Sequence, residues 1–169
     1  GIFLGPDVHF DLVRPGAALH GIAPVPGAPN PLRPVLRLDA RVIQVRAIDA
    51  GTPVGYGGAW RSSQPTRVAT VAVGYADGWL RSSGNRGAAW FGAVPLPIIG
   101  RVSMDTLTLD AGALPDGALQ PGMAVTLIGA RAGIDTVAAD AGTIGYELLT
   151  ALGRRYARRY LRGGAGAGG

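Results

Sequence analysis

The sequence has 169 residues, which suits about one domain, and 47% of them are hydrophobic, which excludes a disordered polypeptide. It contains no cysteine, and this excludes a disulfide framework, a thiolate nucleophile and a cysteine-ligated metal site. All sixteen basic residues are arginine, so the chain supplies no amine for a Schiff base or a phosphate loop, although its net charge of +5 suits an anionic partner.

Membrane and metal sites are not expected from the sequence. Gly, Pro or Arg interrupts every apolar run before the roughly 18 residues that a membrane span needs. The chain does not open with a charged and then apolar leader, so we expect a soluble, cytoplasmic protein. His9 and His20 have no partner at metal-ligand spacing, and we expect both to be structural.

The amino-terminal segment differs in composition from the rest of the chain. Val13 is predicted to end a short buried strand, which Arg14-Pro15-Gly16 breaks into a turn. Residues 24–34 are rich in proline and are predicted to be a linker between two structural units.

Beyond the linker, alternating apolar residues predict short strands joined by Gly and Pro turns. Leu36, Leu38, Ala40 and Val42 share one parity, which slips at Ile43 as in a bulged strand. The expected strands span residues 35–46, 66–73, 90–94, 97–102, 106–110 and 124–128. The pattern indicates a mainly β fold, a small antiparallel sheet or barrel.

Near the carboxyl terminus the period becomes helical. Asp135 is expected to cap a short helix that Gly142 ends. A second, amphipathic helix is predicted from apolar residues every four positions, with arginines on the neighbouring stripe; its apolar residues are Leu148, Leu152, Tyr156 and Tyr160. Residues 163–169 are expected to be a flexible tail.

Five short motifs stand out, and each taken singly also has an ordinary structural reading as a turn, a packed tyrosine or a helix cap. They are Arg14-Pro15-Gly16, Gly55-Tyr56-Gly57-Gly58, the segments 74–78 and 100–105, and the segment 143–147. Arg101 and Asp105 are expected on the same side of a strand, where they could pair or bind a carboxylate. The start of the last helix favours an anion such as phosphate.

Together and in order, these motifs resemble the carboxyl-terminal part of bacterial alanine racemases, a family that uses pyridoxal 5'-phosphate (PLP). The resembling segments are VRPGAALHG (13–21), VGYGGAW (54–60), VGYADGWLR (73–81), PIIGRVSMD (97–105) and TIGYELLT (143–150).

The resemblance implies a domain organisation. Residues 1–23 would be the remnant of a PLP-binding (β/α)8 barrel, and residues 35–162 a carboxyl-terminal β domain with one or two late helices. Family members work as head-to-tail homodimers and supply D-alanine for peptidoglycan. The lysine that forms a Schiff base with PLP lies upstream in the family, and this chain has no lysine. We therefore expect the chain alone to be inactive.

Site residues carry over by their motifs. Tyr56 matches the base that removes the α-proton of L-alanine, acting on the partner's cofactor. Met104 matches a position that meets the substrate carboxylate, and the resemblance places Tyr75, Arg101 and Asp105 along the entrance corridor for substrate. Cofactor-binding positions are matched by Arg14 at the pyridine nitrogen and, at the phosphate, by Gly16, Ala17 and Tyr146. His20 departs from the family, where tyrosine is more usual.

Two alternatives remain open. A racemase of another amino acid, such as serine, would share all of these motifs. The chain could instead be a non-catalytic β module that binds anions through its +5 charge, with nucleic acid as one such anion.

Overall fold

The computed structural model describes residues 3–25 and 28–161, so the tail predicted at 163–169 lies outside the described residues. The strands are β1 (Leu38–Ile48), β2 (Pro53–Val54), β3 (Trp60–Arg61), β4 (Thr66–Val71), β5 (Ala88–Phe91), β6 (Val94–Ile99), β7 (Leu107–Asp110) and β8 (Ala124–Ile128). The helices are α1 (Ile134–Asp140) and α2 (Gly145–Ala151), and the short 3-10 helices are η1 (Pro6–Val8), η2 (Gly16–His20), η3 (Tyr56–Gly58), η4 (Tyr75–Asp77) and η5 (Arg81–Ser83).

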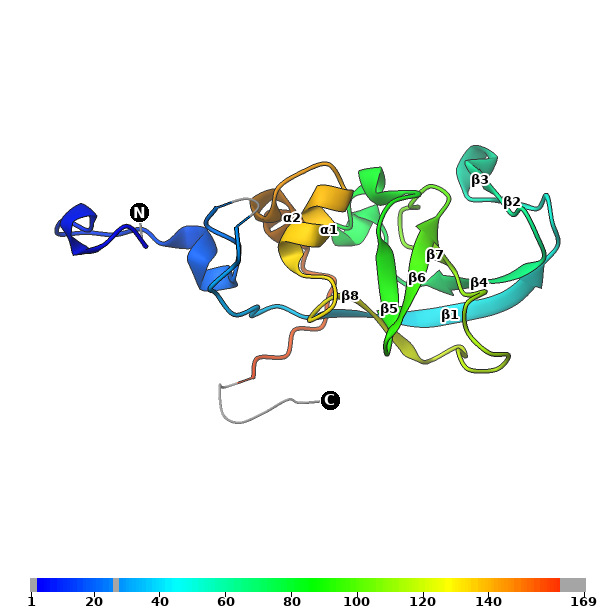
Figure 1. Ribbon diagram of the computed structural model, residues 1–169. Helices are drawn as coiled ribbons and strands as arrows, with labels where there is room; N and C mark the ends of the chain where they lie inside the picture. The colour runs from blue at the N-terminus through cyan, green and yellow to red at the C-terminus, as the bar shows by residue number, and fades with distance from the viewer. Residues whose placement is uncertain (1–2, 26–27, 162–169) are drawn as a thin grey trace.

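A closed antiparallel barrel is the centre of the fold. Its strand order is β1-β4-β7-β6-β5-β8, and β8 returns to pair with β1. Strands β2 and β3 form a separate two-stranded ribbon beside the barrel (Figure 1). The prediction of a mainly β, barrel-like domain with late helices is confirmed.

Strand β1 pairs with two neighbouring strands because it bends at a bulge. Its first half pairs with β8 and its second half with β4, and the register shifts between Val42 and Gln44. Ile43 is therefore the extra residue, and its side chain is exposed. This is the position where the apolar alternation of the sequence slips.

The barrel interior is filled by apolar side chains at alternate strand positions. Those that are at most 1% exposed include Val42, Val71, Leu96, Leu107, Leu109, Val125 and Leu127. Burying each such side chain contributes about 1.5–3 kcal/mol. Trp79, also fully buried, joins the same cluster from the loop after β4.

The strand expected at 35–46 lies instead at Leu38–Ile48, that at 66–73 ends at Val71 and that at 106–110 begins at Leu107, and two further predictions differ more. Residues 90–94 do not form one strand, because Gly92, at φ 58°, turns the chain between β5 and β6, where Phe91 pairs with Val94. The strand predicted at 97–102 begins earlier and ends at Ile99, since Gly100 has φ 73° and leaves the sheet.

The prediction of a long carboxyl-terminal helix is also wrong. Helix α2 ends at Ala151, where Leu152 has ψ 108°. The Gly153 N–H then donates to the Asp77 carbonyl, 3.0 Å away, instead of continuing the helix. Leu152 and Tyr156 still pack against the core although they lie beyond the helix, whereas Tyr160 is exposed.

Helix α1 ends near Gly142 as predicted, but Asp135 is not its cap. Gly133 occupies the capping position, and Asp135 lies in the first turn. The Asp135 carboxylate accepts a hydrogen bond from the Ala23 N–H at 2.8 Å, which fastens the amino-terminal segment to α1.

The amino-terminal segment extends away from the barrel (Figure 1). Val13 is exposed and has no strand structure, so the predicted buried strand end is wrong for this chain. Only Ala17 and Ile22 of this segment join the core cluster. None of the helices in residues 3–25 and 28–161 has the length and hydropathy of a membrane span.

Candidate active site

The β2–β3 ribbon carries Tyr56 and packs on the barrel through Val54 and Trp60. Val54, paired with Trp60 across the ribbon, is buried in a small cluster with Ile48, Val68 and Ile99 of strands β1, β4 and β6. Tyr56 stands in the turn between β2 and β3 with 68% of its surface exposed. The ribbon is thus held in place on the barrel while the Tyr56 phenol faces outward from it.

Two glycines set the position of this turn. Gly55 has φ 76°, and a Cβ built there would lie 2.8 Å from the Arg101 backbone nitrogen. Gly100 has φ 73°, and its Cβ would lie 2.9 Å from the Val54 carbonyl oxygen. Since any side chain would clash at either position, the turn of Tyr56 and the loop after β6 meet backbone to backbone.

The loop between β6 and β7 is held from its other side by the turn of η4. The Tyr75 N–H donates to the Ser103 carbonyl at 3.0 Å, and the Ala76 N–H donates to the Met104 carbonyl at 2.9 Å. Gly74 lies so close to the backbone of this loop that a Cβ at position 74 would overlap the Met104 carbonyl. This loop is therefore placed between two glycine-based contacts.

The two loops enclose a hollow of about 610 Å³. Its lining residues are Gly55, Tyr56, Gly57, Ser103, Met104, Asp105 and Thr106. The structure therefore brings Tyr56, Met104 and Asp105 to one concave surface, with the Met104 side chain half exposed.

Neither Tyr75 nor Arg101 is among the residues that line this hollow. Tyr75 opens η4 and is exposed, while an Arg101 guanidinium nitrogen lies 3.5 Å from where a Cβ on Gly57 would stand. Arg101 and Asp105 do not share a strand face, because the segment after Gly100 is a loop, and that expectation is wrong.

Asp105 pairs instead with Arg155, a residue that sequence spacing did not single out. The Arg155 Nη2 lies 2.8 Å from Asp105 Oδ1, and its Nε lies 3.3 Å from Asp77 Oδ1. The hydrogen bond to Asp105 and the charge of Asp77 raise the pKa of the Arg155 guanidinium. Beside it, burial and the charge of Asp77 raise the pKa of the Tyr156 phenol.

The residues expected at the cofactor form a second group. The Ala17 N–H donates to the Tyr146 hydroxyl at 3.3 Å, and a Cβ on Gly16 would stand 3.7 Å from the same oxygen. Arg14, Ala17 and Tyr146 line one hollow of about 460 Å³. A hydroxyl beside the first backbone N–H groups of η2, with a guanidinium nearby, suits the phosphate and ring nitrogen of PLP.

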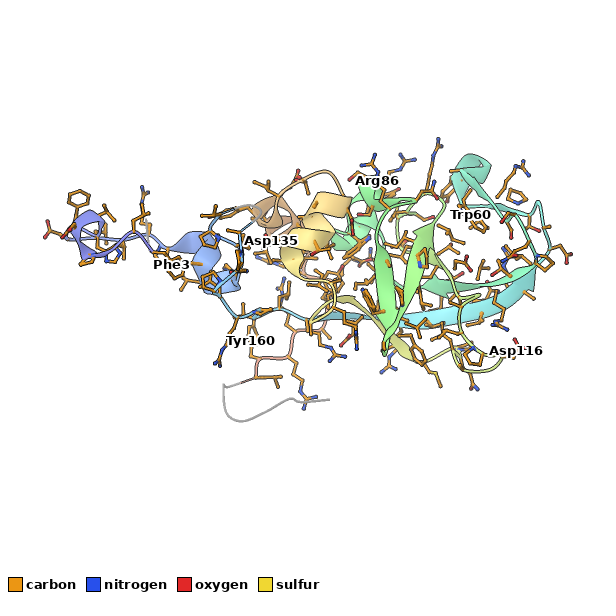
Figure 2. All side chains as sticks on the ribbon, in the orientation of Figure 1. Phe3, Trp60, Arg86, Asp116, Asp135 and Tyr160 are labelled. Atoms are coloured by element: carbon orange, nitrogen blue, oxygen red, sulfur yellow. The ribbon has the colours of Figure 1, made fainter. Side chains whose placement is uncertain are left out.

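The two groups lie at opposite ends of the molecule. In Figure 2, Trp60 marks the end that carries Tyr56, and Asp135 stands nearer the amino-terminal segment. Helix α2, which carries Tyr146, lies beside α1 on that side, far from the β2–β3 ribbon (Figure 1). One copy of the chain therefore does not unite them. Among residues 3–25 and 28–161, no three Asp, Glu or His side chains gather as metal ligands.

Comparisons with known proteins identify the family of this chain. The chain is 57% identical over 164 residues to a catabolic alanine racemase of Agrobacterium fabrum, a match that covers 97% of this chain and 42% of that protein. The structure matches the alanine racemase of Bartonella henselae with covalently bound pyridoxal phosphate at a TM-score of 0.89 and 47% identity, over 95% of this chain and 45% of that one.

A biosynthetic alanine racemase of Pseudomonas aeruginosa matches at a TM-score of 0.84 and 38% identity, over 90% of this chain and 43% of that one. The chain thus spans less than half the length of these relatives. The family model described as "Alanine racemase, C-terminal domain" matches residues 35–160. The chain therefore belongs to the alanine racemase C-terminal domain family.

Proposed function

We propose that this chain is the carboxyl-terminal part of a PLP-dependent alanine racemase, with Tyr56 as the base that acts on L-alanine. The observation that carries the proposal is the hollow shared by the Tyr56 phenol and the Met104 loop. A base and a carboxylate-binding backbone on one concave surface are what proton exchange at the α-carbon of a small amino acid requires. The relatives named above are alanine racemases, which supports the same activity.

In the proposed mechanism, racemisation exchanges the α-proton between two faces of the substrate. Bound PLP supplies the electron withdrawal that makes the α C–H acidic. The Tyr56 oxygen would take the proton on one face as phenolate, becoming the neutral phenol, and would return it as phenol, while the backbone N–H of Met104 would donate to the substrate carboxylate to orient it. The opposite face needs a second base, a lysine in the family, and this chain contains none. We accordingly propose that the chain alone does not racemise.

At the cofactor end, the phosphate would be held by the Tyr146 hydroxyl and the backbone N–H groups of Gly16 and Ala17, which lie together. Arg14 lines the same hollow and would donate to the pyridine nitrogen. A guanidinium does not give up its proton at ordinary pH, so that nitrogen would stay largely unprotonated. This limits electron withdrawal into the ring and disfavours side reactions such as transamination.

The separation of the two groups supports a head-to-tail homodimer. The β2–β3 ribbon, whose turn contains Tyr56, lies well apart from helix α2, which contains Tyr146 (Figure 1), so a complete site would take Tyr56 from one copy and the cofactor group from another. Residues 1–23 would be the end of the cofactor-binding barrel, joined by the linker at 24–34 to the β domain at 35–162. A cytoplasmic location and the supply of D-alanine for peptidoglycan complete the proposal.

A chimera tests the activity and the role of Tyr56. In the Agrobacterium fabrum racemase, this chain replaces the segment that it matches, and racemisation is measured from both alanine enantiomers. We expect activity, and we expect Tyr56→Phe to lower the rate from L-alanine by about 10²–10⁴-fold, the usual contribution of a positioned base. Tyr160→Phe, which removes an exposed hydroxyl, is the matched control and should change nothing.

Four outcomes would contradict the proposal. A folded chimera that binds PLP but racemises nothing would remove the activity, and full activity of Tyr56→Phe would remove the assigned base. A higher kcat/KM for serine than for alanine would favour the alternative substrate. Racemisation by the purified chain itself, free of any longer racemase, would contradict its expected inactivity.

A further inference from the structure

The loop that carries Met104 has little secondary structure of its own. It closes on itself through one backbone hydrogen bond, from the Ser103 N–H to the Thr106 carbonyl at 2.9 Å. Its first residues, Gly100 and Arg101, meet the turn of Gly55, and its Ser103 and Met104 carbonyls accept the two hydrogen bonds from Tyr75 and Ala76 of the turn at residues 74–77. The position of the Met104 end of the loop therefore depends on what holds that second turn.

The buried side chain of Asp77 holds the turn at residues 74–77 together. It is 7% exposed, and its Oδ2 accepts the Gly74 N–H at 2.9 Å. Its other oxygen, Oδ1, faces Arg155 Nε at 3.3 Å. A buried carboxylate without a cation is costly, so the guanidinium stabilises the turn in its present form.

Arg155 reaches this carboxylate from a fixed backbone. The Gly153 N–H donates to the Asp77 carbonyl at 3.0 Å, so the carboxyl-terminal segment is fastened to the turn two residues before the arginine. From there Nη2 extends to Asp105 Oδ1 at 2.8 Å. One planar guanidinium thus joins the turn to the residue that follows Met104.

We propose that Arg155 is a positioning residue of the site: it fixes the Met104–Asp105 loop against the turn of Asp77 and so sets how the Met104 backbone faces Tyr56 across the hollow. The effect of Arg155 on the substrate rests on the proposed function. Its effect on the position of the Met104–Asp105 loop does not, because that concerns this chain alone. Arg155 itself touches neither Tyr56 nor the Met104 backbone and acts through Asp105.

Amide hydrogen exchange on the 169-residue chain tests the structural part. Both carboxylate contacts involve a half-exposed guanidinium, whose ion pairs are weakened by the surrounding water, so Arg155→Gln should speed exchange at residues 103–106 by only about two- to fivefold. Amides of β1 and β8, remote from the loop, should keep their rates. Arg155→Lys retains the charge but cannot contact two carboxylates through one planar guanidinium. Its exchange rates at residues 103–106 should lie between those of the wild type and those of Arg155→Gln.

Arg154→Gln is the matched control. Arg154 is the exposed neighbour of Arg155 and forms no ion pair within residues 3–25 and 28–161, so its loss should leave the loop unchanged. If Arg155→Gln leaves residues 103–106 unchanged, the inference is wrong. It is equally wrong if exchange rises by one common factor throughout the barrel, because that would mean a loss of global stability.

Kinetics of the chimera test the catalytic part. We expect Arg155→Gln to raise KM for alanine by about two- to fivefold with a smaller change in kcat, and Arg155→Lys to restore part of the loss. An unchanged KM together with faster loop exchange would show that the loop position does not matter to the substrate, and this would overturn the positioning role. An inactive parent chimera would instead refute the proposed function, while the exchange result would still decide whether Arg155 holds the loop.

Discussion

The barrel and the amino-terminal segment use apolar residues in opposite ways. Barrel side chains such as Leu109 and Leu127 are fully buried, whereas Phe10 and Leu12 are 87% and 80% exposed. Both regions are rich in such residues, so composition does not separate them. What differs is closure: the barrel strands bury one another's apolar side chains, whereas Phe3, Leu4, Phe10 and Leu12 are exposed in the described chain.

This contrast teaches which part of the chain is self-sufficient. Contiguous exposed apolar side chains mark surfaces that associate with something else. The segment before Gly16 therefore fits the proposal that it belongs to a cofactor-binding unit, while the barrel carries the Tyr56 loops without help. Substitutions, alkaline pH and truncation should accordingly affect the two regions unequally, and buried leucines should show the largest difference.

Matched leucine truncations should separate the two regions most sharply. Leu109→Ala removes a fully buried side chain and should lower the free energy of unfolding by about 2–5 kcal/mol, because it leaves a cavity. Leu12→Ala should change it by less than about 0.5 kcal/mol. Urea unfolding followed by tryptophan fluorescence measures both, and equal losses would mean that the segment is packed in solution.

The loops on the barrel should share its close packing. At Gly74 the backbone is extended, so only space limits a side chain, and Gly74→Ala would push a methyl group into the Met104 carbonyl. We expect a loss of about 1–3 kcal/mol. Gly153→Ala is the control, since its Cβ would meet only an ordinary contact at 3.6 Å, and it should cost less than about 0.5 kcal/mol. A tolerated Gly74→Ala would show that the loop can move away.

Alkaline unfolding tests how the carboxyl-terminal segment joins the barrel. Burial and Asp77 raise the pKa of Tyr156 above the usual phenol value of about 10, so the folded state favours the neutral form. This stabilisation is complete below pH 10 and is lost as the pH rises further. The unfolding free energy should therefore fall more steeply above pH 10 in the wild type than in Tyr156→Phe.

Below pH 9 the two proteins should differ by less than about 1 kcal/mol, since the Tyr156 hydroxyl has no hydrogen-bond partner within the described residues. Unfolding midpoints measured from pH 8 to pH 11 give both results. Parallel curves over this range would mean that Tyr156 is not buried in solution.

The smallest effect should come from removing the exposed segment. A chain that begins at Val13 lacks no buried residue of the described structure and keeps Ala17 and Ile22. Its unfolding free energy should lie within about 0.5 kcal/mol of the full chain. A larger loss in urea unfolding would show that residues before Val13 contribute to the barrel.

Local patterns in the sequence predicted the barrel well because strand alternation depends on neighbouring residues. The strand at 124–128 has the expected bounds, and the parity slip at Ile43 is a bulge. The helix predicted through Tyr160 is wrong because a tertiary hydrogen bond from Gly153 to Asp77 ends α2, and no local spacing reports such a bond.

Part of the candidate site could likewise be predicted from local motifs, and part could not. The motifs brought Tyr56 and Met104 to attention, and the structure brings both to one hollow. Arg155 was missed, because its partners Asp77 and Asp105 lie far away in the sequence and meet it only through the closure of the barrel. Ion pairs of this kind are a product of topology and leave no periodic signal.

The backbone contact between Gly55 and Gly100 has an evolutionary consequence. Because no side chain stands between the two turns, either glycine can be replaced only if the opposite strand end moves as well. The pair is therefore expected to be inherited together. At this point of the reactive surface, backbone atoms and not side chains set the spacing between the two loops.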